Sequence, residues 1–153
     1  MTADLVLERI VPCTVEHLWR GWTDPEVLVR WFTPAPWKTI EAEIELRPGG
    51  IFRTVMQGPD GETGGGEGCV LVAESMSRFV WTSALGPGFR PVSAAEGEFL
   101  FTADIEFAPA TGGALYRATA RHVNEADAAV HAEMGFHQGW GAALDQLVAL
   151  FDS

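Results

Sequence analysis

The strongest constraint on the fold is a switch to two-residue periodicity just after residue 38. Between residues 39 and 46 one face is apolar and the other is acidic; the apolar positions are Ile40, Ala42, Ile44 and Leu46. Such alternation predicts a half-buried antiparallel strand. Strand patterns then follow one another, first with Phe52, Thr54 and Met56 on one face, then over residues 69–74, 78–84, 98–107 and 114–122. Because no helical pattern lies between these strands, a parallel sheet is excluded.

Short helical patterns precede this run of strands. A first strand is predicted over residues 4–11, and Thr14 is a suitable N-cap for the short helix that follows. Asp24 and Pro25 suit the N-cap and first position of a second helix, which we expect to run to about Phe32.

A long helical pattern follows the strands, from Asn124 to Phe151. Its apolar stripe consists of Trp140, Leu144, Leu147 and Phe151. Gly135 and Gly139 lie one turn apart on a neighbouring face, and glycine destabilises a helix interior by about 1 kcal/mol. Their presence predicts either a close approach to the sheet or a widened space beside the helix.

This order of elements predicts an α+β fold in a single domain over residues 1–153. We expect a curved antiparallel sheet of about six to seven strands around the long C-terminal helix. The two short helices would plug one end of the sheet. A long loop over residues 85–97 and a glycine-rich hairpin loop over residues 58–68 complete the prediction.

Composition narrows the classes of partner. The net charge is −11 and Lys38 is the only lysine, so nucleic acid and anionic membrane surfaces would repel the chain. No apolar run is long enough for a transmembrane helix, and Met1 to Glu8 does not resemble a signal peptide. Two cysteines form no disulfide framework, which favours a cytoplasmic location. The chain is expected to be a monomer or a homodimer.

Residue spacing argues against several kinds of catalytic or cofactor site. The glycine-rich segment lacks the lysine and register of a phosphate-binding loop. His131 and His137 are six residues apart on the helix and point to different sides, so no metal site is predicted; Glu133 and His137 have the spacing of a surface contact. Cys13 and Cys69 are interpreted as buried, unreactive thiols. No cofactor and no catalytic residue is assigned.

Aromatic residues provide the remaining signal, because six Trp and nine Phe are many for 153 residues. The candidate ligand-binding residues are Trp31, Phe52, Met56, Trp81, Phe99, Phe101, Tyr116, His122, Phe136 and Trp140. The alternative is a solid aromatic core. Ala118 and Ala120 share a strand face with Tyr116 and His122 and would leave room for a ligand, whose orientation those two polar groups would fix.

The motifs of the chain also resemble a known family. They are Val15–Trp19, Trp22–Pro25, Trp31–Phe32, Arg47–Arg53 and His131–Leu147, which together extend over most of the sequence. In their order and spacing the chain is similar to the START-like helix-grip (SRPBCC) superfamily. Within it, the chain resembles bacterial proteins similar to the C-terminal domain of the activator of the heat-shock chaperone ATPase (AHSA-like proteins). The resemblance implies a helix-grip fold with a hydrophobic cavity that different members use for different ligands.

Three functions remain open. The first is binding of a small hydrophobic or aromatic molecule, such as a lipid- or polyketide-like ligand, between the sheet and the C-terminal helix. The second is an enzyme of cyclase or hydratase type that uses His122 or Tyr116 as acid or base. The third is a chaperone-interaction module; however, the co-factor that gives the family its name has a further N-terminal domain, for which 153 residues leave no space. We favour binding over catalysis.

Overall fold

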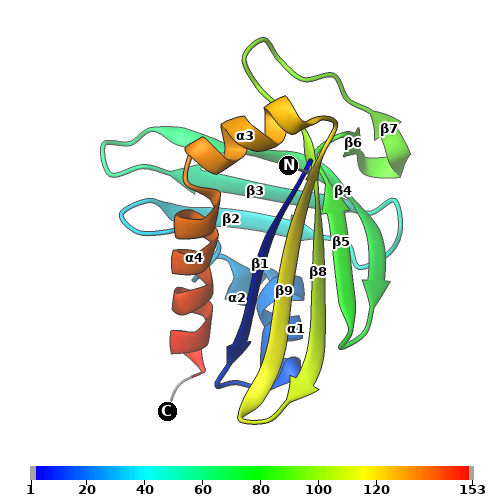
Figure 1. Cartoon of the computed structure of the whole chain (residues 1–153). Coiled ribbons are helices and arrows are strands. Elements are labelled where there is room, and N and C mark those ends of the chain that lie inside the picture. Colours follow the sequence, from blue (N-terminus) through cyan, green and yellow to red (C-terminus); the bar gives the residue numbers. More distant parts are fainter. Residues whose placement is uncertain (1–2, 152–153) are drawn as a thin grey trace.

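The fold is an antiparallel sheet that curves around its C-terminal helix (Figure 1). The computed structural model describes residues 3–151, so both predicted domain limits, residues 1 and 153, lie outside the described residues. The strands are β1 (Asp4–Val11), β2 (Lys38–Ile44), β3 (Ile51–Gln57), β4 (Thr63–Glu74), β5 (Arg78–Thr82), β6 (Leu85–Gly86), β7 (Arg90–Pro91), β8 (Phe101–Ala110) and β9 (Gly113–His122). The helices are α1 (Val15–Thr23), α2 (Pro25–Leu28), α3 (Glu125–Glu133) and α4 (Phe136–Leu150), with a 3₁₀ turn at Pro87–Phe89.

Seven strands form the main sheet in the order β1-β9-β8-β5-β4-β3-β2, and every neighbouring pair is antiparallel. The helices α1 and α2 close one end of the curved sheet, and α4 stands across its concave side (Figure 1). The predicted α+β helix-grip architecture is therefore confirmed. The small strands β6 and β7 pair only with each other, within the long loop predicted between β5 and β8.

Both short helices begin where the sequence predicts. The Thr14 side chain accepts a hydrogen bond from the backbone N–H of His17 at 3.0 Å, and Nδ1 of His17 accepts one from the N–H of Thr14. This reciprocal pair is a capping box. Asp24 caps α2 ahead of Pro25. However, α2 ends at Leu28 and continues only as turns, so the expectation of a helix to Phe32 was too long.

The predicted C-terminal helix is divided into α3 and α4, of which α4 is the long helix that covers the sheet. Gly135 lies between them with φ +94°, a left-handed conformation that glycine adopts without steric cost. The N–H of Gly135 bonds to the carbonyl of Ala132 and ends α3, while Gly135 itself caps α4. Periodicity alone did not show this break, because residues of helical type continue on both sides of Gly135.

The glycine-rich segment was predicted as a loop, and most of it is strand. Residues 63–68 belong to β4 and pair with β3, so only the turn around residues 58–62 is a loop. A side chain at Gly65 would collide with the carbonyl oxygen of Thr54, so glycine permits the close strand approach here.

A register shift alters the predicted faces of β2. The pairing with β3 slips between Thr39 and Glu41, so Thr39 is buried and Ile40 is exposed, opposite to the simple alternation. An extra residue in one strand turns side chains to the other face.

Candidate functional site

A cavity of about 600 Å³ lies between the concave side of the sheet, the segment after α2 and the C-terminal helices. This volume is within the range usual for small-molecule sites. Its enclosed part is formed by buried side chains: Trp22, Trp31, Phe52, Trp81, Tyr116, His131 and Phe136. Its rim is formed by exposed residues of β4, of the loop before β8 and of the α3–α4 junction: Glu67, Val92, Ser93, Ala95, Glu98 and Met134. The cavity is therefore open to solvent along this rim.

Aromatic rings in contact with one another build the enclosed wall. The ring of Trp81 stacks on Phe52 with centroids 4.4 Å apart and meets Phe101 at 5.5 Å. On the helix side, Phe136 and Trp140 lie 4.9 Å apart. Such ring pairs are stabilising beyond their buried area and hold the wall in a defined shape.

Two glycines keep the helix side of the cavity open. Gly135 and Gly139 both line it. A side chain added at Gly139 would meet no atom within 4 Å, and at Gly135 only the amide oxygen of Gln138 at 3.8 Å. Of the two explanations predicted for these glycines, the widened space is therefore correct at Gly139.

Nine of the ten predicted ligand-binding residues line this one cavity: Trp31, Phe52, Met56, Trp81, Phe99, Phe101, Tyr116, Phe136 and Trp140. The tenth, His122, lies behind the wall. Ala118 and Ala120 are fully buried but are not part of the lining, so the room they were expected to leave is filled by packing. Small side chains on β9 thus serve the close packing of the core rather than the cavity.

Two buried histidines form a hydrogen-bonded pair at the wall. Nδ1 of His122 lies 2.8 Å from the backbone carbonyl oxygen of Ala3, which can only accept, so this nitrogen carries the proton. Nε2 of His122 lies 2.8 Å from Nδ1 of His131. His131, rather than His122, is the histidine that lines the cavity. From the sequence, His131 was considered only as a possible metal ligand, because no sequence pattern indicates its contact with His122 between α3 and β9.

Burial holds His131 in its neutral form. Burial first, and the nearby His122 second, lower the pKa of His131 from 6.5 to about 4. Around its ring lie the aromatic rings of Phe99, Phe101 and Phe136, with centroids 4.8, 4.9 and 5.2 Å away. At neutral pH the cavity therefore presents an uncharged imidazole within an aromatic surround.

The indole N–H of Trp81 is buried at the cavity wall without a partner. Within residues 3–151 it is the only fully enclosed side-chain nitrogen or oxygen that makes no hydrogen bond. The other two buried indoles are satisfied, since Trp22 donates to the hydroxyl of Tyr116 and Trp31 to the carbonyl of Gly21. An unpaired buried donor destabilises the fold by about 1–3 kcal/mol, so it is an unusual feature that calls for an explanation.

The lining has no cationic side chain. Of the described residues that form it, only Glu67 and Glu98 are charged at neutral pH, and both are on the rim. An anionic ligand would find no counter-charge in the cavity and would be repelled at its mouth.

The geometry gives little support to acid–base catalysis by the predicted residues. Burial raises the pKa of the Tyr116 phenol far above its usual range, an effect only partly offset by the hydrogen bond from Trp22. Such a phenol is a weak acid at neutral pH. His122 lies behind His131 and does not reach the cavity surface.

Metal binding finds no site in the part of the chain that the structure describes, where no three residues among His, Cys, Asp and Glu come together. Nε2 of His137 donates to the backbone carbonyl of Val6 at 3.1 Å, which corrects the expected contact with Glu133. Burial raises the pKa of the Cys13 thiol, and Cys69 is fully buried.

Comparison with known proteins decides the family. Residues 12–152 match the family described as Activator of Hsp90 ATPase homolog 1-like protein. The chain belongs to this family. The resemblance in the sequence motifs is thus confirmed, and the Activator of Hsp90 ATPase homolog 1-like fold accounts for the order of helices and strands. No curated protein matches the chain.

Solved structures agree with this assignment. A protein from Nitrosomonas europaea is 42% identical, with a TM-score of 0.91 over 97% of this chain and 93% of that one. A protein from Rhodobacter sphaeroides is 23% identical, with a TM-score of 0.82 over 97% and 92% of the two chains. One from Mycobacterium smegmatis is 22% identical, with a TM-score of 0.81 over 99% and 92%. The last two show the shared fold alone.

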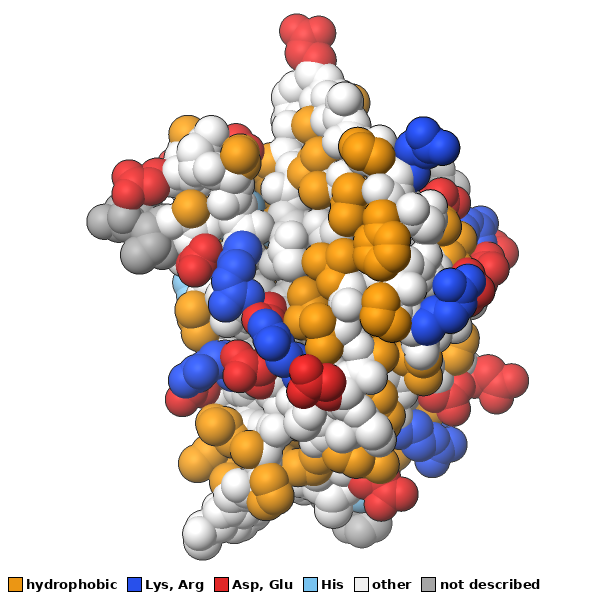
Figure 2. Space-filling view, turned by 90° about the vertical axis from the view of Figure 1, so that its right-hand side faces the viewer, with side chains coloured by type: hydrophobic (Ala, Val, Ile, Leu, Met, Phe, Trp, Pro, Cys, Tyr) orange, Lys and Arg blue, Asp and Glu red, His pale blue; other side chains and the backbone are white. Residues whose placement is uncertain are grey.

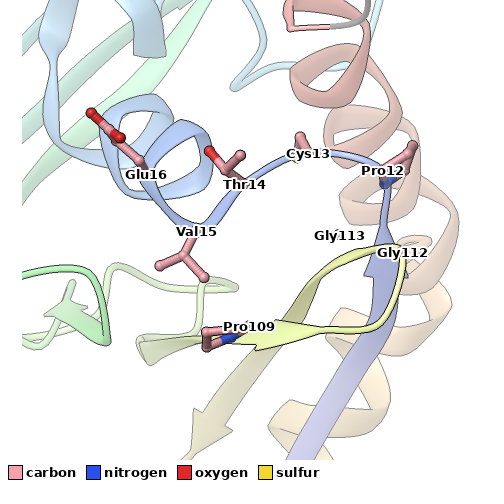
Figure 3. A pocket seen from close by; sticks show the side chains of 8 residues that line it. All are labelled: Pro12, Cys13, Thr14, Val15, Glu16, Pro109, Gly112 and Gly113. Carbon is pink, nitrogen blue, oxygen red and sulfur yellow. The ribbon is translucent and has the colours of Figure 1, made fainter.

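Two other features mark the surface of this family member. A more open hollow lies where β1 leads into α1, beside the β8–β9 turn; Figure 3 shows its lining: Pro12, Cys13, Thr14, Val15, Glu16, Pro109, Gly112 and Gly113. Figure 2 shows the face of β4 and β5, where hydrophobic side chains form a band between charged ones. An exposed apolar surface is what a protein-interaction role requires.

None of the helices within residues 3–151 is long and apolar enough to span a membrane.

Proposed function

We propose that this protein binds a small, largely apolar molecule in the cavity between the sheet and the C-terminal helices. The observation that carries the proposal is a cavity of about 600 Å³ whose wall consists of contacting aromatic rings and whose helix side is open at Gly139. A densely packed core leaves no void of this size, whereas a mostly apolar cavity of several hundred Å³ is typical of small-molecule sites. Family membership agrees with a ligand-binding or chaperone-related module and does not choose between them.

Filling the cavity from its helix side tests the proposal. In Gly139→Leu the new side chain would enter open space from a position with ordinary helical geometry. Replacement of glycine also favours the helix by up to about 1 kcal/mol. The variant should therefore be at least as stable as the parent protein, while its cavity is smaller.

Binding is measured by the fluorescence of Nile red, a neutral apolar probe, in titrations with each protein. The parent protein should bind it, and Gly139→Leu should bind at least about tenfold more weakly because the side chain occupies the space. The matched control is Ala142→Leu, which adds a leucine to the exposed side of the same helix. Absence of binding by the parent protein, or equal binding by both leucine variants, would overturn the proposal.

Association with a chaperone is the second candidate, and the family assignment is compatible with it. It predicts a different response to the same variants. A partner bound at the outer surface would be indifferent to Gly139→Leu, whereas a ligand in the cavity would not.

A further inference from the structure

We infer that the molecule bound in this cavity is neutral and donates a hydrogen bond, through a hydroxyl or N–H group, to Nε2 of His131. The inference rests on the proposed binding function and names the chemical class of the ligand. It follows from the direction of the hydrogen bonds behind the wall and from the charges of the wall itself.

The direction of the hydrogen bonds is fixed at the carbonyl of Ala3. That oxygen accepts the proton on Nδ1 of His122, so in the neutral ring Nε2 of His122 is an acceptor. The bond to His131, 2.8 Å long, must then be donated by Nδ1 of His131. A neutral His131 with its proton on Nδ1 has a bare lone pair on Nε2. The backbone carbonyl of Ala3 thus fixes the proton positions on both rings and leaves Nε2 of His131 as a hydrogen-bond acceptor for the cavity.

This nitrogen is free to meet a ligand. Within residues 3–151 the structure gives Nε2 of His131 no hydrogen-bond partner. In the same range the Trp81 N–H is the only side-chain polar group that is both unpaired and fully enclosed. Nε2 of His131 therefore keeps some accessible surface, although the residue as a whole is only 8% exposed. Because the ring lines the cavity, that surface is available to an occupant.

The wall disfavours a ligand with a negative charge. The lowered pKa of His131 leaves it uncharged at neutral pH, and the charged lining residues are Glu67 and Glu98. A carboxylate would lose its hydration without gaining a cation or a donor at this position. A hydroxyl group replaces its hydrogen bond to water by one to the imidazole and loses little.

An aromatic surround encloses this acceptor. The ring of Phe101 is 4.9 Å from that of His131 and 5.5 Å from that of Trp81, whose N–H is fully enclosed and does not reach the cavity. The cavity thus offers one acceptor within an aromatic wall. A mainly aromatic molecule with one hydroxyl or N–H group fits this pattern.

Four probes of similar size separate the possibilities: 2-naphthol, 2-methoxynaphthalene, naphthalene and 2-naphthoate. Isothermal titration calorimetry at pH 7.5 should give 2-naphthol an affinity about threefold to tenfold higher than naphthalene and 2-methoxynaphthalene, the effect of one net hydrogen bond. The anion 2-naphthoate should bind more weakly than naphthalene. In His131→Phe, naphthalene should still bind while the preference for 2-naphthol disappears. The control His137→Phe, which changes a histidine outside the cavity, should keep that preference.

The outcomes distinguish failure of the inference from failure of the proposed function. Equal binding of naphthalene and 2-naphthol by the parent protein would overturn the inference and leave the binding function standing. Binding of 2-methoxynaphthalene as tightly as 2-naphthol would mean that His131 donates rather than accepts, and tightest binding of 2-naphthoate would mean that the site is cationic; each overturns the inference. If no probe binds, the proposed function fails as well. These comparisons use the parent protein and do not depend on the folding of a variant.

Discussion

Nδ1 of His131 lies 2.8 Å from Nε2 of His122, so a side chain from α3 and one from the end of β9 share a hydrogen bond beneath the cavity wall. Nδ1 of His122 in turn donates a hydrogen bond to the carbonyl oxygen of Ala3, just before β1. The pair therefore ties the end of β9 and the following helix α3 to Ala3, which lies 119 residues before His122. It also leaves His131 as a buried neutral base whose protonation must disturb the fold.

The free energy of unfolding should fall as the pH is lowered through the range in which His131 is protonated in the unfolded chain but not in the folded protein. Because the pKa of His131 is lowered from 6.5 to about 4 in the fold, the unfolded chain binds the extra proton between these values. Its contribution to stability is complete above pH 6.5 and is lost toward pH 4, with a slope of up to about 1.4 kcal/mol per pH unit. Urea unfolding at pH 7.5, 6.5, 5.5 and 4.5 measures the slope.

Carboxylates also titrate at the lower end of this range, so the contribution of His131 is obtained from the difference in pH dependence between a variant and the parent protein. His131→Phe should show a shallower loss of stability than the parent between pH 6.5 and 5, while His137→Phe should match the parent. A slope unchanged by His131→Phe would contradict the assignment of a buried, neutral His131.

The unpaired indole of Trp81 predicts an unequal response to two identical substitutions. Trp31→Phe strands the buried carbonyl of Gly21, which now receives its N–H at 2.9 Å, and should cost about 1–3 kcal/mol beyond the lost packing. Trp81→Phe removes a donor that has no partner and relieves its desolvation. Thermal and urea unfolding of ligand-free protein should therefore find Trp31→Phe the more destabilising by at least about 1 kcal/mol. Equal losses would indicate that the Trp81 N–H is paired in solution.

The two glycines at the cavity should respond to alanine in opposite directions. Gly135 has φ +94°, so Gly135→Ala forces a side chain into the left-handed region and should destabilise the protein by about 1–2 kcal/mol. Gly139→Ala adds a methyl group in open space within α4 and should stabilise it by up to about 1 kcal/mol. Differential scanning calorimetry compares the two. A fall in melting temperature for both variants would mean that the space beside Gly139 is filled.

The wall of the cavity was predictable to a large extent from the sequence. Residues on alternate positions of a strand share a face, so the aromatic residues of β3, β5 and β8 were expected to point the same way, and they do. His122 was misplaced because the last residues of β9 lie under α3, and strand periodicity does not show which helix covers a strand end. His131, Gly65 and Glu98 escaped notice because each joins the cavity through long-range packing, with no local pattern to mark it.

The sequence by itself determined the order of elements, the antiparallel sheet and the apolar character of one face. These follow from local periodicity, capping residues and turns, which act between neighbours along the chain. Only the tertiary structure decided that α4 turns away from α3 at Gly135, that His131 stands in front of His122, and that Trp81 keeps an unpaired N–H. These features depend on how the helices pack on a twisted sheet. Contacts there join residues as far apart as Val6 and His137, which are separated by 131 positions, beyond the reach of any periodic pattern.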